Sequence, residues 1–341
     1  MRIGLGGRGR SVAVLVGLLA VAIVPLVAFP AVRCEVFGSG CPRPVAAKAD
    51  DTVRAPQRRP LTPVEAATGG TYVALGDSYS SGVGAEATAA DHNPLSGCRR
   101  TSKAYYHQVA RSFRFKSTAF WACAGATTRT VLTGKSGEPS QLDRIDGGTS
   151  LITISVGGND IGFSRVMAGC VVKLPWSRSC TEQGKDVAYR IADLRRSLPD
   201  LYARIIAKAP RARIVVMGYP RPFSEVDGAA GDNISVGDQQ WLNARARDLN
   251  EVIRQTVAEA DQRVAETNGA GSVEFVDAYS AFAGHEVGSA DPYMNGLAVS
   301  LASLAAEPRS FHPTARGHEA LARLFIAQIN RGPGRPLHQF R

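Results

Sequence analysis

Hydrophobic and polar positions alternate in two ways along the chain after about residue 70. Short runs rich in β-branched and aromatic residues predict strands at 71–78, 117–125, 150–160, 213–220 and 273–280. Longer stretches with apolar residues three or four positions apart predict helices at 102–114, 185–208, 238–267 and 313–330. Because nearly continuous apolar strands alternate with helices, we expect one α/β domain over 71–330, with a parallel sheet covered on both faces.

The chain before this domain has a different pattern. Three arginines in the first ten residues precede an uncharged apolar run over 11–32. Residues 1–32 are therefore either a secretory signal peptide or an N-terminal membrane anchor, and both predict that the remainder is exported, secreted or held at the outer face of the membrane. Residues 33–70 are rich in proline, alanine and charge, which predicts a linker that is mostly extended or disordered.

Composition narrows the class of protein. With 44% hydrophobic and 21% charged residues, the chain is neither a disordered nor a polytopic membrane protein. Its net charge is +10, half of it within residues 1–66, and residues 331–341 form a short basic tail. The rest has no basic stripe with interleaved aromatic residues, so we expect no nucleic-acid partner.

The cysteine content fits an exported protein. The chain has six, Cys34, Cys41, Cys98, Cys123, Cys170 and Cys180. An even number outside the cytosol predicts disulfide bonds, whereas a zinc site would need closer Cys or His ligand spacing than this chain has. Many pairings are open, and we favour sequence-near partners: Cys34–Cys41, Cys98–Cys123 and Cys170–Cys180. The Cys98–Cys123 bridge closes the longest loop and should matter most to stability.

Three predicted strands end in residues that can carry chemistry. Ser78 follows the first strand among small residues, which allow a sharp turn that exposes its hydroxyl as a nucleophile. Gly125 and Asn159 follow the second and third strands and could offer a backbone N–H and a side-chain amide to an oxyanion. Each is also an ordinary turn residue, and the serine turn could be an anion-binding loop without chemistry. The carboxyl ends of parallel strands share one edge, which favours the catalytic interpretation.

A serine nucleophile needs a base, and six histidines are candidates. His312 directly precedes Pro313 and the last predicted helix. A proline at the first helical position would fix the start of that helix and direct the preceding loop to the catalytic edge. His318 lies one turn further along the same helix, where we expect a structural hydrogen bond.

These residues together resemble the motifs of the SGNH, or GDSL, hydrolase family. The blocks Gly76-Asp77-Ser78, Gly125, Gly157-x-Asn159-Asp160 and His312-Pro313 occur in the family's order. The resemblance implies a three-layer α/β/α sandwich with a mainly parallel five-stranded sheet, a flavodoxin-like fold. It implies Ser78 as nucleophile, His312 as base, and an oxyanion hole formed by the Ser78 and Gly125 amides and the Asn159 side chain.

Two segments sharpen the resemblance. GCRRTSKAYYHQVA and WACAGATT are similar to sequences of the secreted actinobacterial lipase and esterase branch. That branch supports the Cys98–Cys123 and Cys170–Cys180 pairings, although its usual third pair within the domain is missing here.

The chain departs from the family near the histidine. An aspartate usually stands three residues before it, and here that position is Arg309, whose side chain cannot accept a hydrogen bond. By analogy with members that use a Ser–His dyad, we expect the backbone carbonyl of Arg309 to orient His312. Asp277, after the last strand, is a substitute for the missing carboxylate, or else a turn or helix cap, and Glu307 is a weaker candidate.

The resemblance implies an exported serine ester hydrolase of the esterase or lipase type, which works through an acyl-enzyme without a metal or an organic cofactor. Its substrate would be an ester, with lipids and acylated cell-surface polymers as candidate classes. An acyltransferase would use the same residues while excluding water. A non-catalytic surface-binding module is the third hypothesis, against which the retention of Ser78, Gly125, Asn159 and His312 argues.

Overall fold

The structure is a computed structural model that describes residues 59–86, 97–171, 179–224, 234–300 and 306–339. The chain divides into two compact units, 1–57 and 58–341, and every described residue belongs to the second. The predicted signal or anchor and the Cys34–Cys41 pair lie outside the described residues. Within the described ranges, no helix is both long and apolar enough to cross a membrane.

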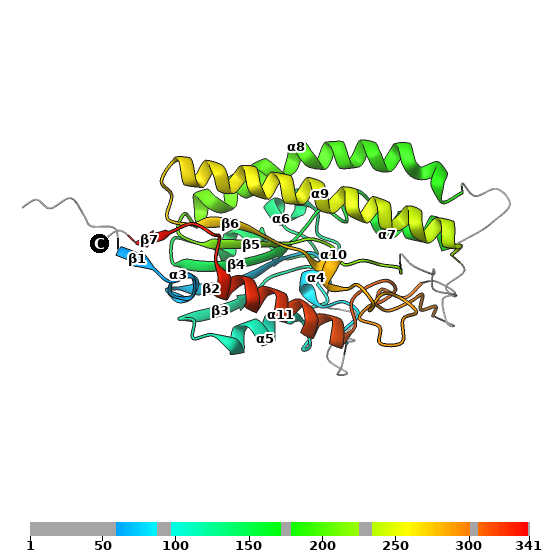
Figure 1. The fold of residues 1–341 in the computed structure, drawn as a ribbon, viewed down its shortest axis with the longest axis horizontal. Coiled ribbons are helices and arrows are strands. Elements are labelled where there is room, and N and C mark those ends of the chain that lie inside the picture. Colours follow the sequence, from blue (N-terminus) through cyan, green and yellow to red (C-terminus); the bar gives the residue numbers. More distant parts are fainter. Residues whose placement is uncertain (1–58, 87–96, 172–178, 225–233, 301–305, 340–341) are drawn as a thin grey trace, which may run out of the picture. The chain divides into compact units, whose positions relative to one another are not determined.

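Five parallel strands form the central sheet (Figure 1). In spatial order they are β3 (Ser117–Phe120), β2 (Thr71–Gly76), β4 (Thr149–Ser155), β5 (Arg213–Met217) and β6 (Ser272–Val276). All neighbouring pairs run parallel, which confirms the predicted parallel sheet. Each strand ends several residues earlier than its predicted run because the chain turns away at the carboxyl edge of the sheet.

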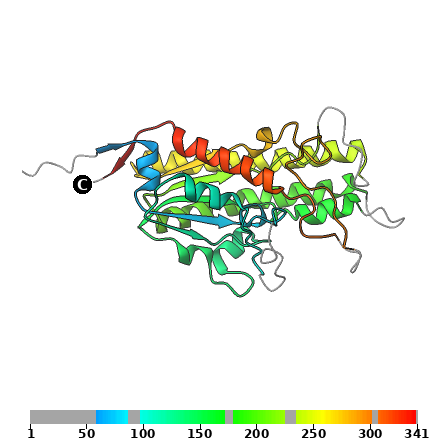
Figure 2. The same ribbon diagram turned by 90° about the horizontal axis from the view of Figure 1, so that it is seen from below.

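Helices cover both faces of this sheet (Figures 1 and 2). On one face lie α8 (Gly184–Lys208) and α9 (Val236–Glu266), and on the other lie α3 (Pro63–Thr68), α5 (Tyr105–Ser112) and α11 (Ala315–Arg331). Side chains of β2 alternate between the two cores: Val73 and Leu75 belong to the core under α8 and α9, whereas Tyr72 and Ala74 belong to the other. The fold is the predicted three-layer α/β/α sandwich.

Short helices connect the strands to these layers. They are α4 (Ser78–Ser81), α6 (Thr128–Thr133), α7 (Phe163–Val171), α10 (Ala278–Ala281) and the 3₁₀ turns Gln141–Arg144 and Thr181–Gln183. The α7 helix has no counterpart among the predicted helices. Because it follows β4 directly, it stands beside the carboxyl edge of the sheet.

The start of α11 differs from the prediction. Thr314 is its N-cap, with a side chain that accepts the Gly317 N–H at 3.1 Å, and the helix begins at Ala315. Pro313 therefore lies before the cap rather than at the first helical position. The threonine hydroxyl, which satisfies one of the free amides of the first turn, sets the boundary here.

The end of the predicted linker has regular structure, and the expectation of a mostly extended or disordered segment does not hold for the helix over residues 63–68. β1 (Arg59–Leu61) pairs antiparallel with β7 (Leu337–Gln339), which comes from the predicted basic tail. Thr62 and Glu65 form a capping box at the start of α3, and Pro63 occupies its first turn. The Thr-Pro-Val-Glu sequence is the signal that could have revealed this helix.

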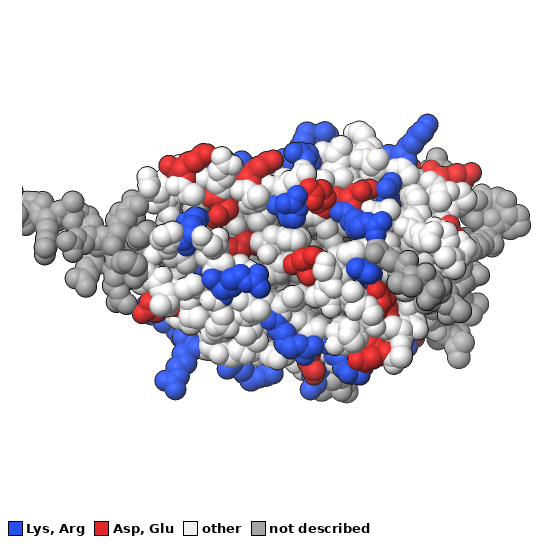
Figure 3. Space-filling view, viewed as in Figure 1, with Lys and Arg blue, Asp and Glu red and all other residues white. Residues whose placement is uncertain are grey.

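Two disulfide bonds fasten loops of this domain. Cys98–Cys123 and Cys170–Cys180 are both formed, which confirms these two predicted pairs. On the face seen in Figure 3, basic and acidic side chains are interspersed. The positive excess is therefore not gathered into one patch on that face.

Candidate active site

The strand order creates a reversal point at the carboxyl edge of the sheet. The chain passes from β2 to β3 on one side and then returns to β4 on the other side of β2. In open α/β sheets, such a point leaves a crevice between the loops that follow the two flanking strands. Here those loops carry Ser78, after β2, and Asn159, after β4. The predicted site residues therefore come together because of the topology.

Backbone geometry places Ser78 at a sharp turn between β2 and α4. Gly76 has a φ of +116°, and a Cβ at this position would lie 2.3 Å from the Ser155 carbonyl oxygen, so the turn requires glycine. The Asp77 carboxylate then caps α4 by accepting the Tyr79 N–H at 3.0 Å. Ser78 occupies the first position of α4, where an amide N–H has no acceptor within the helix.

Ser78 and His312 form a close pair. The Nε2 atom of His312 lies 2.9 Å from Ser78 Oγ, and its Nδ1 atom lies 3.0 Å from the carbonyl oxygen of Ser310. Since a carbonyl can only accept, Nδ1 carries the proton in the neutral ring, and Nε2 is left as the acceptor for the serine hydroxyl. Burial lowers the pKa of His312, an effect partly offset by the Ser310 carbonyl and the Glu86 charge. The ring is thus held in the form that can take a proton.

The expectation for Arg309 is wrong in its details. Its carbonyl accepts the backbone N–H of His312 at 3.1 Å, not the imidazole, while its side chain pairs with Glu307 at 2.7 Å. The carbonyl that faces the ring is that of Ser310. Asp277 caps α10 by accepting the backbone N–H and the hydroxyl of Ser280, so its carboxylate serves the helix.

The loop before His312 is fixed in an uncommon conformation. Phe311 has a φ of +58°, which a non-glycine residue adopts only when its surroundings impose it. Tyr79 Oη donates to the Phe311 carbonyl at 2.9 Å, and the Asn295 side chain donates to the His312 carbonyl at 2.9 Å. The Ser310 hydroxyl bonds both backbone groups of Ala298. These contacts aim the Ser310 carbonyl at the ring.

His318 has the structural role predicted for it. Its side chain is fully buried, and its Nδ1 accepts the Tyr105 backbone N–H at 3.3 Å. Burial lowers its pKa to about 3, so the ring stays neutral. His318 therefore ties α11 to α5.

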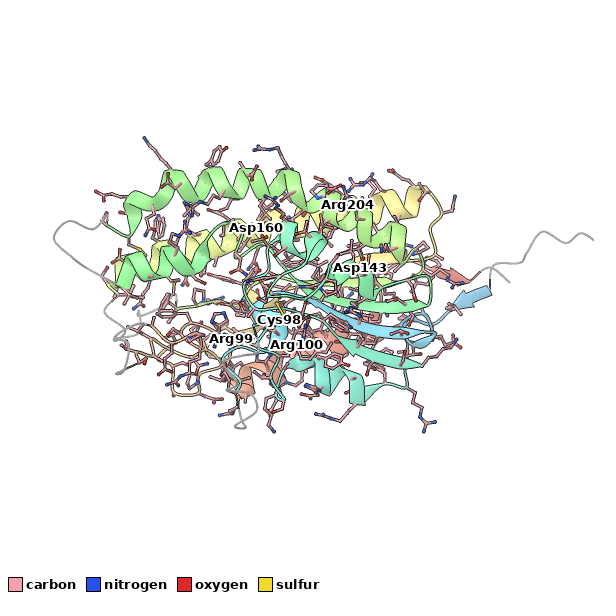
Figure 4. All side chains as sticks on the ribbon, turned by 180° about the vertical axis from the view of Figure 1, so that it is seen from behind. Cys98, Arg99, Arg100, Asp143, Asp160 and Arg204 are labelled. Carbon is pink, nitrogen blue, oxygen red and sulfur yellow. A yellow bond between two sulfur atoms is a disulfide. The ribbon has the colours of Figure 1, made fainter. Side chains whose placement is uncertain are left out.

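The side chain of Asn159, a further candidate oxyanion donor, is bonded to the turn that carries the other candidate, Gly125. Asn159 Nδ2 donates to the Ala126 carbonyl at 3.0 Å, next to Gly125, and a primary amide keeps a second hydrogen for another acceptor. Asp160 accepts both the N–H and the hydroxyl of Thr128, at 3.0 and 2.6 Å, and so connects this turn to α6. Figure 4 labels Asp160 and Cys98 at this end of the sheet.

Asp77 is the centre of a buried polar network that the sequence analysis missed. Only 1% of its surface is exposed, and its carboxylate accepts the Ser155 hydroxyl at 2.7 Å and the hydroxyl of Tyr219. The Tyr219 hydroxyl in turn accepts the Gly158 N–H at 2.8 Å. Burial, the largest cause, raises the pKa of Asp77 to about 6, although these hydrogen bonds oppose it. Tyr219 ends a predicted strand at the catalytic edge, which was the available signal.

A cavity of about 270 Å³ opens beside the Ser78–His312 pair. Ser78, Asn159 and His312 line it, and Gly125, one strand further along the sheet, is not part of its wall. The aliphatic, phenylalanine and proline side chains of the wall are Phe163, Met167, Ala168, Val171, Leu297, Ala306, Pro308 and Phe311. Among the described residues, no cluster of three His, Cys, Asp or Glu side chains is arranged to hold a metal ion. The arrangement fits an apolar group bound next to the Ser78 hydroxyl.

Comparisons with known proteins agree with this geometry. Residues 74–320 match the model of the GDSL-like Lipase/Acylhydrolase family. A lipase of Streptomyces rimosus is 35% identical over 248 residues, which cover 72% of this chain and 81% of the relative. Lipase 1 of Streptomyces coelicolor is 35% identical over 247 residues, with the same coverage.

Two solved structures share the fold. Phospholipase A1 from Streptomyces albidoflavus NA297 superposes with a TM-score of 0.64 at 33% identity, covering 76% of this chain and 99% of that one. The extracellular lipase from Streptomyces rimosus gives 0.63 at 32% identity, with the same coverage.

Proposed function

The chain belongs to the GDSL-like lipase/acylhydrolase family, and we propose that it is an exported enzyme that cleaves carboxylic esters through an acyl-enzyme on Ser78. Ester hydrolysis follows from the family. The acyl-enzyme, the roles of single residues, the export and the substrate class are the proposal. The observation that carries it is the 2.9 Å contact between Ser78 Oγ and His312 Nε2 beside an apolar cavity.

In the first step His312 acts as base. Its Nε2 takes the hydroxyl proton while Ser78 Oγ forms a bond to the ester carbonyl carbon, and the carbonyl electron pair moves onto oxygen. When this intermediate collapses, the ester C–O bond breaks and His312 returns the proton to the leaving alcohol. Water then repeats the sequence on the acyl-enzyme and releases the acid and free Ser78.

Three donors would stabilise the oxyanion. The Ser78 amide is free at the start of α4, Gly125 follows β3, and the Asn159 amide keeps one hydrogen beyond its bond to Ala126. Donors fixed by a fold need little reorganisation as charge develops, which makes this the largest expected contribution to catalysis.

No carboxylate holds the imidazole in this proposal. The Ser310 carbonyl selects the tautomer and carries a partial negative charge that favours the transient imidazolium. Burial lowers the pKa of His312 below its usual value, so the ring is unprotonated at neutral pH and available as a base. The dyad therefore relies on the rigid loop around Phe311 for its orientation.

The cavity indicates the acyl part of the substrate. Much of its wall is formed by side chains of α7, Leu297 and residues 306–311, which offer mainly apolar surface for dispersion contacts. We therefore expect esters of apolar acids, such as those of lipids, to be preferred over acetyl esters or acetylated polymers. The lipase and phospholipase A1 relatives support this choice, and the extracellular relative and the two disulfides support export.

The test is hydrolysis of p-nitrophenyl esters from acetyl to palmitoyl by the full chain, together with labelling by a fluorophosphonate. Ser78→Ala should lose at least about 10⁴-fold of the activity and all of the label. Ser164→Ala is the matched control, because this serine lines the same cavity from α7. Full activity in Ser78→Ala contradicts the acyl-enzyme. Faster acyl transfer to an added alcohol than to water would instead identify a transferase.

A further inference from the structure

One hydroxyl joins the two loops that carry the proposed nucleophile and oxyanion amide. Tyr219 Oη donates to Asp77, the residue before Ser78, and accepts the N–H of Gly158, the residue before Asn159, at 2.8 Å. Tyr219 itself follows β5, a third strand. The pairing between β2 and β4 ends at Gly76 and Ser155. The Tyr219 hydroxyl therefore connects the segments that follow these two strands, beyond their last paired residues.

From this geometry we infer that Tyr219 is a positioning residue of the hydrolytic reaction, whose hydroxyl keeps Ser78 and Asn159 at the separation at which both reach the same ester carbonyl. The inference rests on the proposed function and goes beyond it by adding a residue of the cavity wall that acts through its bonds to Asp77 and Gly158. Misplacement by a fraction of an ångström weakens both attack and oxyanion binding.

Tyr219 is itself held firmly enough for this task. Asn250 of α9 accepts the Tyr219 N–H at 2.7 Å and donates to its carbonyl at 2.8 Å. The ring of Tyr79 packs edge-on against it with 5.0 Å between centroids. A Cβ on Gly158 would come within 2.9 Å of the Tyr219 ring, so glycine at that position permits the close approach.

The Tyr219 hydroxyl affects the pKa of the Asp77 carboxyl, which gives its role a measurable consequence. Burial raises the pKa of Asp77 and the Tyr219 hydroxyl lowers it. The other titratable groups that face Asp77 are Tyr79, Tyr105 and Asp160, and burial raises the pKa of each. Tyr219 also has a raised pKa, so it stays a neutral donor to the carboxylate. Loss of this donor should raise the pKa of Asp77 further.

The experiment compares Tyr219→Phe with the wild type in the full chain, with rates normalised to active sites titrated by a fluorophosphonate. We expect kcat on a p-nitrophenyl ester to fall about 10²-fold with KM changed less than about threefold. The acid limb of the kcat profile should move to higher pH, which lost stability alone would not cause. Tyr202→Phe is the matched control: Tyr202 is as deeply buried, but its hydroxyl lies near Thr256 on the α8–α9 side.

An unchanged kcat, or a lower kcat with an unmoved acid limb, overturns the inference. If Tyr219→Phe does not fold, Asn250→Ala takes its place, because it frees the Tyr219 backbone from α9; a smaller fall in kcat with the same shift of the limb is then expected. The failure of the proposed function would look different: the wild type would hydrolyse no ester, or Ser78→Ala would remain active. Either of these results would overturn the inference together with the proposed function, whereas an unchanged kcat in Tyr219→Phe would overturn the inference alone.

Discussion

At the amino edge of the sheet, Arg213 of β5 and Glu274 of β6 form an ion pair at 2.7 Å with both side chains almost fully buried. At the carboxyl edge, Asp77 is equally buried, but its partners are two hydroxyls and a backbone amide. In the described part of the chain, no Lys, Arg or His side chain pairs with Asp77. The buried charges at the amino edge therefore compensate each other, whereas the Asp77 carboxylate at the carboxyl edge has no compensating charge among the described residues.

The ion pair at the amino edge also connects the sheet to two helices. The Arg213 guanidinium also donates to the carbonyls of Pro63, Gln328 and Ile329, and so joins α3 and α11 to the sheet. The carboxyl edge is fastened by the two disulfides instead. The Asp77 carboxylate, which has no cationic partner, and the uncommon backbone conformation of Phe311 both lie at this carboxyl edge, where the proposed catalysis takes place.

The largest expected effect would break the ion pair. Arg213→Met leaves Glu274 buried without a partner and should lower the free energy of unfolding by about 3–5 kcal/mol. Because the pair lies at the opposite edge from Ser78, kcat per titrated site should stay the same. Urea unfolding followed by tryptophan fluorescence measures the first quantity. The double variant Arg213→Met/Glu274→Leu should recover much of the loss, and a kcat that fell in step would refute the separation of the two edges.

A substitution at the carboxyl edge should lower activity strongly and stability only slightly. Asn159→Ala removes one proposed oxyanion donor and should lower kcat by about 10²–10³-fold, with a change in unfolding free energy of only about 1 kcal/mol. Asn330→Ala, an exposed asparagine on α11, is the control for the substitution. Ester hydrolysis and urea unfolding on the same samples test the prediction, and a stability loss as large as that of Arg213→Met would count against it.

A pH series tests the unbalanced carboxylate. Burial raises the pKa of Asp77 from 3.8 to about 6, so the stability contributed by its protonated form is present below pH 3.8 and lost as pH rises through about 6. Asp77→Asn cannot ionise. Its stability relative to wild type should therefore rise between pH 4 and 7.5, by up to about 3 kcal/mol. Asp143→Asn, at an exposed carboxylate labelled in Figure 4, is the control for the substitution itself; a flat difference for Asp77→Asn would disprove the raised pKa.

The smallest expected effect distinguishes the two disulfides. Cys98 and Cys123 are 25 residues apart, and Cys170 and Cys180 are 10 apart. Replacing the first pair by serines should cost about 3 kcal/mol of unfolding free energy, and replacing the second about 1 kcal/mol less, because the shorter loop restricts the unfolded chain less. Urea unfolding of both double variants provides the comparison, and a larger loss from the second pair would show that native contacts at α7 dominate.

The sequence predicted much of the fold because its signals are local. Apolar runs and helical periodicity located all five strands of the central sheet and the long helices α8, α9 and α11, with errors mainly at their ends. Thr314, rather than Pro313, decided where α11 begins. The α7 helix was missed because it is short and begins three residues after the end of the predicted strand at 150–160, and α3 because a proline-rich linker concealed its capping box.

The sequence by itself pointed to the candidate site residues that have a distinctive side chain, since Ser78, Asn159 and His312 are recognisable wherever they stand. Only the tertiary structure decided what orients the base and what links the loops. Every residue has a carbonyl, so no residue type marks Ser310, and the φ of Phe311 turns that carbonyl toward the ring. Tyr219 likewise reaches Asp77, 142 residues away, only because β5 and β2 lie in one sheet. The direction of a backbone carbonyl and the contact between residues far apart in the sequence are set only when the chain folds.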